Sequence, residues 1–326
     1  MNIQTHPIPR ADDAAKFRDP DTTAAGEPRA IVPFERLETL WINTGTLCNI
    51  TCRNCYIESS PANDRLVYVT ATEIAPLLDE AEAEGAREIG FTGGEPFLNP
   101  DMIALAEASL ARGFATLILT NAMQPMLRAR VKKGLLDLQS SHGEKLTLRV
   151  SLDHHTKALH EAERGQRTWS KALDGLDWLL GNKFRVTIAG RTCWGESEAE
   201  ARAGYAALFS ANNWAIDAAD AAQLVLFPEM DGRHHVPEVS ARCWDKFGKR
   251  PEEMMCATSR MVVKRKGAES LAVVPCTLLP YAPEFDMGAT LAAARTADGG
   301  MFAGGAVKLC HPHCSKFCVL GGGSCS

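Results

Sequence analysis

The feature of this sequence that most limits its fold is a regular alternation of two kinds of segment between residues 37 and 230. Short runs rich in Leu, Ile, Val and Thr are typical of buried strands, and the longer amphipathic segments between them are typical of helices. The expected strands are residues 37–45, 86–93, 114–121, 145–153, 184–192 and 223–230. The expected helices are residues 70–85, 100–113, 122–138, 168–182 and 196–212. This alternation predicts βαβ units and a parallel sheet.

The number of predicted strands narrows the architecture of that sheet. Six strands are too few for a closed eight-stranded barrel. An open doubly wound sheet remains an alternative, although no G-x-G-x-x-G motif follows the first predicted strand. In either architecture, the functional residues are expected at the carboxyl ends of the strands.

Two irregular regions flank the alternating segment, so we predict three parts along the chain. Residues 1–36 are rich in Pro, Asp, Arg and Thr without periodicity, which predicts an extended arm. Residues 37–230 form an α/β domain, and residues 231–326 form a small cysteine-rich domain with a predicted hairpin over 261–276. The last residues are too few to bury a core of their own, so metal ligation would supply the missing stability.

The chain is predicted to be cytoplasmic. It lacks the run of about 20 apolar residues that a membrane span needs, and its first residues lack the apolar core of a secretory signal. A net charge of −5 gives no reason to expect nucleic acid or an anionic membrane as a partner. The cytoplasm keeps thiols reduced, so the 11 cysteines are not expected to form disulfides.

Most of the cysteines fall into two groups. The first lies in the stretch LCNITCRNCY (47–56), directly after the first predicted strand, with the spacing C-x3-C-x2-C. Thiolates are the ligands that iron–sulfur clusters select, and three of them leave one metal position open, as a catalytic centre requires. A structural zinc site completed by a distant residue is the alternative, because the loop offers no fourth ligand nearby.

The cysteine loop resembles that of radical S-adenosylmethionine (radical SAM) enzymes, and two other motifs extend the resemblance. TGGEP (92–96) is similar to the family's glycine–glycine–glutamate–proline motif after the second strand, and SLD (151–153) follows the fourth strand, as is common in the family. The resemblance implies a partial (β/α)6 barrel over residues 37–230. It also implies reductive cleavage of S-adenosylmethionine to methionine and a 5′-deoxyadenosyl radical, which abstracts hydrogen from a substrate.

The resemblance implies roles for individual residues. Cys48, Cys52 and Cys55 would bind three irons of a [4Fe–4S] cluster, and the methionine group of S-adenosylmethionine would bind the fourth. The cofactor would be contacted by residues at the ends of three strands, namely Gly93, Gly94, Glu95, Pro96, Ser151, Asp153 and Arg191.

The chemistry of these residue types fits those roles. The bare backbone of the two glycines allows a ligand to approach, and Pro96 fixes the turn. Glu95 or nearby carbonyls would accept from the ammonium group, and Arg191 would pair with the carboxylate. For Arg191 and Asp153, a solvated ion pair is the alternative. One departure from the family is Asn54, which stands where an aromatic residue often precedes the third cysteine.

The second group of cysteines lies in the C-terminal domain. It resembles the auxiliary-cluster domains of radical SAM enzymes, called SPASM or, when shortened, twitch. Its members are Cys256, Cys276, Cys310, Cys314, Cys318 and Cys325. The resemblance favours one [4Fe–4S] cluster bound by the first four. Cys318 and Cys325 would bind a second cluster, replace one of the four, or act chemically. A zinc site with His311 and His313 as further ligands is the alternative.

The sequence therefore predicts a radical SAM enzyme with an auxiliary cluster that assists oxidation or substrate binding. Oxidation of a small molecule is slightly favoured over maturation of a ribosomally made peptide, because peptide maturases often carry a leader-binding domain and only about 36 residues precede the barrel. A non-catalytic iron–sulfur or zinc redox sensor is the alternative of another class, although a sensor has no need of the TGGEP turn. An electron donor such as flavodoxin or ferredoxin is the expected protein partner.

Overall fold

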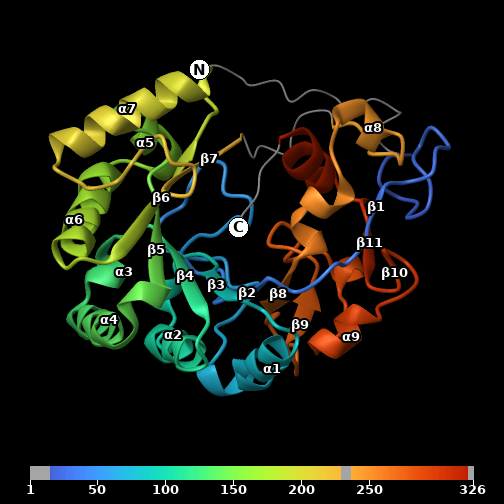
Figure 1. Cartoon of the computed structure of the whole chain (residues 1–326), viewed down its shortest axis with the longest axis horizontal. Helices are drawn as coiled ribbons and strands as arrows, with labels where there is room; N and C mark the ends of the chain where they lie inside the picture. Colours follow the sequence, from blue (N-terminus) through green and yellow to red (C-terminus); the bar gives the residue numbers. More distant parts are fainter. Residues whose placement is uncertain (1–14, 229–235, 322–326) are drawn as a thin grey trace.

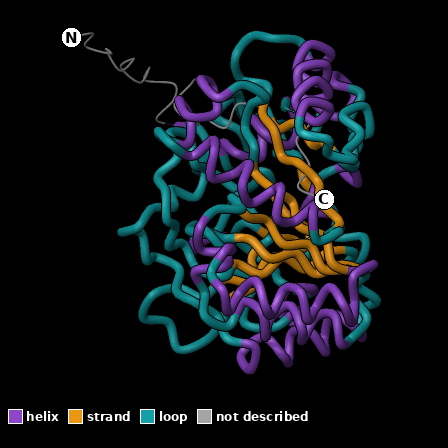
Figure 2. Tube along the Cα trace, turned by 90° about the vertical axis from the view of Figure 1, so that its left-hand side faces the viewer, coloured by secondary structure: helices purple, strands orange, loops and turns teal. Residues whose placement is uncertain are grey.

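The structure is a computed structural model that describes residues 15–228 and 236–321 (Figure 1). Within these ranges, the strands lie inside a shell of helices and loops (Figure 2). The first part of the predicted arm, residues 1–14, and the predicted ligand Cys325 lie outside the described residues.

The central sheet has eight strands, in the order β7-β6-β5-β4-β3-β2-β8-β9. Six of them alternate with helices along the chain, and each is parallel to its neighbours. Those six are β2 (Thr39–Asn43), β3 (Glu88–Thr92), β4 (Ala115–Thr120), β5 (Leu146–Ser151), β6 (Arg185–Arg191) and β7 (Leu224–Phe227). They follow the order of the chain, without the reversal that defines a doubly wound sheet. The predicted partial (β/α)6 barrel is therefore confirmed.

The long helices cover the outer face of this sheet (Figure 1). They are α1 (Ala71–Ala83), α2 (Met102–Ala111), α4 (Ala129–His142), α6 (Thr168–Gly181) and α7 (Glu198–Ala211). The helix expected over 122–138 is interrupted, because Arg128 takes an extended backbone between the short α3 (Gln124–Leu127) and α4. A helix that the sequence did not predict, α5 (Lys157–Arg164), follows β5. None of the helices within the described ranges is long and apolar enough to cross a membrane.

The barrel strands are apolar because both of their faces are covered. All five residues of β2 are buried. Leu40 and Ile42 belong to the large core between the sheet and its helices. Trp41, which lies between them, packs in a second core with Met261 and Val263. Successive side chains of a strand point to opposite faces of the sheet, so apolar groups cover both faces. The carboxyl edge of the sheet remains for the site.

The segment after residue 236 continues the barrel sheet. The predicted hairpin is confirmed as β8 (Ser259–Val263) and β9 (Ala272–Val274), and β8 pairs in parallel with β2. A separate sheet contains β1 (Ile31–Val32), β11 (Ala306–Lys308) and β10 (Phe302–Ala303). The remaining elements are α8 (Cys243–Phe247), α9 (Leu291–Arg295), a π-helical segment at Cys314–Leu320, and 3-10 turns at Pro96–Leu98, Gly143–Lys145, Pro251–Glu253, Met255–Ala257 and Pro283–Phe285.

The described part of the N-terminal arm packs against the C-terminal segment, and the blue and red ends of the described chain meet in Figure 1. β1 pairs antiparallel with β11. The buried guanidinium of Arg29 donates to a carboxylate oxygen of Glu238 at 2.8 Å and to the Thr22 carbonyl at 2.8 Å. Residues from both ends of the chain therefore stabilise one region of the fold, and the boundaries near 36 and 230 remain sequence predictions.

Candidate functional site

The loops at the carboxyl ends of the barrel strands enclose a cavity of about 180 Å³. The C-x3-C-x2-C loop meets residues from the ends of β3 to β7 there, as a set of parallel strands predicts. The predicted site residues that line it are Cys48, Cys52, Cys55, Gly93, Gly94, Ser151, Asp153 and Arg191. Polar lining residues outside the predicted set include Asn121, Glu163 and Arg164.

The thiols of the loop are suited to binding a metal rather than to acting as free nucleophiles. Burial raises the pKa of Cys48 to about 12 and that of Cys52 to about 11, so neither thiol would ionise at neutral pH without a nearby cation. A bound metal supplies positive charge, and the Arg164 guanidinium near both thiols adds to it. Three thiols line this space, and no fourth cysteine is among the described residues around it. This donor set fits an iron–sulfur cluster with one open iron.

The glycines of TGGEP hold the start of the cysteine loop. The backbone N–H of Gly94 donates to the Gly45 carbonyl at 2.9 Å, and that of Glu95 donates to the Leu47 carbonyl at 3.1 Å. A Cβ atom on Gly94 would lie 2.2 Å from the Leu47 oxygen, and Gly93 has a φ of +143°. The sequence predicts that these glycines let a ligand approach. The structure shows that the backbone of the cysteine loop occupies the space where a Cβ atom on Gly94 would lie.

The Glu95 carboxylate is bound within the protein. It is fully buried and accepts hydrogen bonds from the Thr120 hydroxyl at 2.8 Å, the Asn121 N–H at 2.9 Å and the Phe97 N–H at 3.2 Å. Burial raises the pKa of Glu95 to about 7, although these hydrogen bonds oppose the shift. The residues described as lining the cavity do not include Glu95 or Pro96. The observed role of Glu95 is to fix the end of β4 to the glycine turn, and its contact with an ammonium group remains a prediction.

Two buried ion pairs close one side of the cavity. Arg164 donates to both oxygens of Asp153, at 2.8 and 2.9 Å, and Arg191 donates to Glu163 at 2.7 Å. Burial alone would lower the pKa of Arg164, but the Asp153 carboxylate and the nearby Cys52 raise it overall. The sequence identified Asp153 and Arg191 but missed their partners at the end of α5. Both pairs are buried, unlike the solvated pairs that the sequence left open.

Glu163 also fixes the cysteine loop. Its carboxylate accepts from the backbone N–H of Asn54 at 2.8 Å and from the Asn54 side-chain amide at 3.3 Å. The Arg53 N–H donates to the Glu163 carbonyl at 2.7 Å. Asn54, the polar residue that departs from the family pattern, therefore has a structural partner in Glu163. It attaches the loop to α5 and, because Glu163 also binds Arg191, to the end of β6.

The second cysteine group surrounds a small apolar cavity. Cys256 precedes β8, Cys276 follows β9, and Cys314 and Cys318 lie in the π-helical segment. All four line the same space, together with Met254, Met255, Pro275, Leu278, Leu279, Val307 and Leu309. Burial raises the pKa of Cys256 to about 11. Burial also raises the pKa values of Cys276 and Cys314 well above the ordinary value, and for these two the neighbouring thiols add to the shift. Four thiols in apolar surroundings fit a four-cysteine metal centre.

Cys310 is not among the described residues that line this cavity. Its Sγ is 3.4 Å from the carbonyl oxygen of Asp19, in the N-terminal arm. A ring nitrogen of His313 lies 3.0 Å from the Leu278 carbonyl, and neither His313 nor His311 is among the described lining residues. Burial lowers the pKa of His311 to about 3. The structure therefore places Cys318, rather than Cys310, with the other three cysteines of the favoured set.

A family model identifies the chain. The model, described as the Radical SAM superfamily, matches residues 42–201, which include the cysteine loop, the TGGEP turn and SLD. Residues 42–201 form a radical SAM domain. Radical SAM proteins bind a [4Fe–4S] cluster and S-adenosylmethionine, and the three thiols of the main cavity fit that cluster.

This radical SAM protein matches curated relatives over part of their length. It is 31% identical over 176 residues to the serine-type anaerobic sulfatase-maturating enzyme of Klebsiella aerogenes. The match covers 51% of this chain and 41% of that protein. It is 30% identical over 158 residues to GTP 3′,8-cyclase of Rhodococcus opacus. That match covers 41% of this chain and 45% of the relative. The chain therefore spans less than half the length of these two relatives.

Solved structures share the fold beyond the barrel. Native anSMEcpe with bound AdoMet and Kp18Cys peptide superposes with a TM-score of 0.55 over 80% of each chain. Its sequence is 17% identical to this radical SAM protein, so the likeness concerns the fold. The match covers more of the chain than the barrel alone.

Replacing Glu163 with glutamine should destabilise this radical SAM protein by about 3 kcal/mol, because it removes the negative charge from a buried ion pair with Arg191. Urea denaturation under anaerobic conditions measures the change. The matched control is Glu198→Gln, which removes a carboxylate that is 65% exposed and pairs with Arg202. Its effect should stay below about 1 kcal/mol. Equal effects of the two variants would show that the Glu163 pair contributes no more than a surface pair.

Proposed function

We propose that this protein is a radical SAM enzyme that modifies a peptide. The observation that supports the activity most strongly is the meeting of Cys48, Cys52 and Cys55 with the glycine turn and the Asp153–Arg164 pair in one cavity. When bound, a reduced [4Fe–4S] cluster and S-adenosylmethionine supply radical abstraction of hydrogen from a substrate. A redox sensor would need the thiols but not a cavity of this kind beside them.

In this proposal, the chain's own residues hold and orient the cofactors. The three cysteines of the loop bind the cluster, and Glu163 and the glycine turn fix that loop in place. Carbonyl groups of the TGGEP turn accept from the ammonium group of S-adenosylmethionine, and Ser151 and Asp153 face its ribose or the substrate. Arg164 and Arg191 line the cavity and would supply positive charge for a carboxylate of the cofactor. Their existing carboxylate partners keep both guanidinium groups in fixed positions.

The C-terminal cysteines would bind an auxiliary [4Fe–4S] cluster. We assign its ligands to Cys256, Cys276, Cys314 and Cys318, because these four share one cavity. Tyr281, which follows Cys276 along the chain, donates its hydroxyl to the carbonyl of Ile57, a residue that lines the main cavity, at 2.6 Å. The cluster would accept an electron from a substrate radical or bind the substrate. A flavodoxin or ferredoxin would supply the reducing electron, and the cytoplasm would keep the thiols reduced.

A peptide is the substrate class that the comparisons support best. A sulfatase-maturating enzyme is similar in sequence, and anSMEcpe with a bound peptide shares the fold. This moves our proposal from the small molecule that the sequence slightly favours to a peptide. A small-molecule substrate remains the second candidate, because GTP 3′,8-cyclase is similar over a comparable length.

The substrate class can be tested with a short peptide encoded beside this protein's gene. The reduced, anaerobically reconstituted protein is incubated with S-adenosylmethionine and that peptide. We expect 5′-deoxyadenosine to form faster than without peptide and the peptide mass to change in the same samples. The matched control is the same peptide with its residues in scrambled order. No change in peptide mass, together with faster 5′-deoxyadenosine formation on addition of a nucleotide such as GTP, would favour the small-molecule candidate instead.

A further inference from the structure

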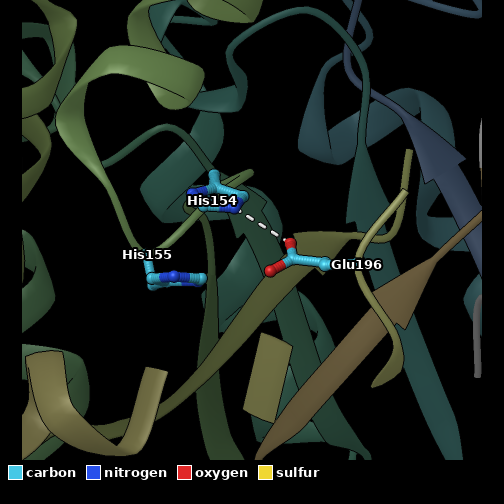
Figure 3. Close-up of side chains that lie close together, drawn as sticks. All are labelled: His154, His155 and Glu196. Atoms are coloured by element: carbon cyan, nitrogen blue, oxygen red, sulfur yellow. Dashed lines mark ion pairs between the residues drawn. The ribbon is translucent and has the colours of Figure 1, made fainter. Parts of the chain in front are cut away.

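Arg260, in β8, is a charged side chain in the core of the protein. Several other buried titratable groups face an opposite charge. Nδ1 of His154 accepts from the Thr156 backbone N–H at 2.9 Å, so its proton lies on Nε2, which is 2.9 Å from a carboxylate oxygen of Glu196 (Figure 3). Both arginines of the main cavity also pair with carboxylates. Arg260 is only 1% exposed, yet it forms no ion pair with a carboxylate of residues 15–228 or 236–321.

The guanidinium of Arg260 is held by carbonyl groups and an aromatic ring. Its Nη1 donates to the carbonyls of Cys256 at 2.7 Å and Ser259 at 2.8 Å, and its Nη2 donates to that of Gly305 at 3.0 Å. The guanidinium carbon lies 3.9 Å from the centroid of the Phe34 ring. Nε has no hydrogen-bond partner among the described residues. Carbonyl dipoles and an aromatic face attract a cation without neutralising it, so a buried charge of this kind is costly.

The thiols of the auxiliary cavity offer the opposite charge. Burial lowers the pKa of Arg260 to about 10. The Cys256 and Cys276 sulfurs oppose this shift most strongly, and the Glu84 carboxylate follows them. Glu84 is paired with another guanidinium, that of Arg295, at 3.3 Å. The main opposite charges near Arg260 are therefore those that the two cysteines would carry as metal-bound thiolates.

We propose that Arg260 is the counter-charge of the auxiliary [4Fe–4S] cluster and raises its reduction potential. This inference rests on the auxiliary cluster of the proposed function. Four thiolates outweigh the positive charge of an iron–sulfur core, so the bound centre is an anion, and reduction makes it more negative. Net charge around a cluster is one of the factors that set its potential. Arg260 is bonded to the backbone of the ligand Cys256, so its charge stays beside the centre and favours the reduced state.

This charge suits a centre that accepts electrons. When one electron passes from a substrate radical to the cluster, the radical is oxidised and the cluster is reduced. Arg260 makes that transfer more favourable, because it stabilises the added negative charge in surroundings from which water is excluded. A purely structural Arg260 would also join β8 to the turn at Gly305, but it would leave the potential unchanged.

The reduction potential of the auxiliary cluster tests this role. An EPR-monitored redox titration is carried out on the full-length, anaerobically reconstituted protein. The auxiliary signal is identified as the one that persists when Cys48, Cys52 and Cys55 are replaced by alanine. Arg260→Gln keeps an amide donor but loses the charge. We expect its equilibrium constant for one-electron reduction to fall at least about tenfold, which corresponds to about 59 mV, with the auxiliary iron content unchanged.

Two control variants separate charge from structure. Arg260→Lys keeps the positive charge and should have a potential closer to that of the wild type than to that of Arg260→Gln. Arg295→Gln removes a guanidinium that is 55% exposed and paired with Glu84, and it should leave the potential unchanged. If Arg260→Gln does not fold by circular dichroism, Arg260→Met is measured in its place, because methionine fills buried space without a polar group.

An unchanged potential in a folded neutral variant that retains auxiliary iron would overturn this inference and leave the proposed function standing. Equal shifts in Arg260→Lys and Arg260→Gln would overturn it too, because a lost contact rather than a lost charge would then set the potential. Absence of auxiliary iron from the wild type would overturn it together with the auxiliary cluster of the proposed function.

Discussion

Replacing Cys48, Cys52 and Cys55 together with alanine should abolish formation of 5′-deoxyadenosine while leaving the C-terminal iron in place. The three thiols line the main cavity, and the variant removes every cysteine that the described residues place around it. The fold of the loop should survive, because its short hydrogen bonds to the rest of the protein are made by backbone groups and by the side chains of Asn49 and Asn54. Cys48, for example, donates its own N–H to the Ser60 carbonyl.

The measurement combines iron analysis with chromatography of 5′-deoxyadenosine after reduction by dithionite. We expect the variant to lose about four irons per chain and to keep about four, as one of two [4Fe–4S] clusters is removed. Cys243→Ala is the matched control, since Cys243 lines neither cavity. That control should retain both iron and activity. Continued 5′-deoxyadenosine formation by the triple variant would mean that the main site is assigned to the wrong cysteines.

Cys276→Ala should remove the auxiliary iron, whereas Cys310→Ala should retain it. Cys276 is buried among the other three thiols of the C-terminal cavity, and the loss of one of four ligands opens the metal centre. Cys310 faces the Asp19 carbonyl instead. Because metal binding and folding are coupled in a small domain, Cys276→Ala should also lower the Tm, and a thermal melt is needed before activity is compared.

The two variants also separate the roles of the two clusters. A folded Cys276→Ala protein should still form 5′-deoxyadenosine, since that reaction needs only the main site, but it should not form the modified substrate. The assignment of Cys318 in place of Cys310 is wrong if Cys310→Ala loses the auxiliary iron as completely as Cys276→Ala. Full product formation by a folded Cys276→Ala variant without auxiliary iron would rule out a catalytic role for that cluster.

The barrel was predictable because its strands and most helices bury apolar side chains at regular spacing. α5 was not, because its buried residues are His160 and Glu163, so its buried face carries no apolar repeat. Two of the main site's partners, Glu163 and Arg164, lie at the end of that helix. The contacts that join them to Asn54, Asp153 and Arg191 come from tertiary structure and leave no local pattern in the sequence.

The C-terminal ligands show a similar limit. The spacing of Cys310, Cys314 and Cys318 is C-x3-C-x3-C, which gives no reason to prefer either outer cysteine. The structure separates them because Cys314 and Cys318 share one π-helical segment, whereas Cys310 comes before it and faces the N-terminal arm. That arm comes from the opposite end of the chain, so no local pattern predicts the contact.

The most direct test of the radical SAM assignment is a combined measurement on one sample of the wild-type protein, purified and reconstituted without oxygen. Iron and zinc are counted per chain, and 5′-deoxyadenosine is measured after addition of dithionite and S-adenosylmethionine. Our account predicts iron for two [4Fe–4S] clusters, about eight atoms per chain, and slow formation of 5′-deoxyadenosine even without substrate. Zinc in the thiol sites with little iron, and no 5′-deoxyadenosine, would contradict it.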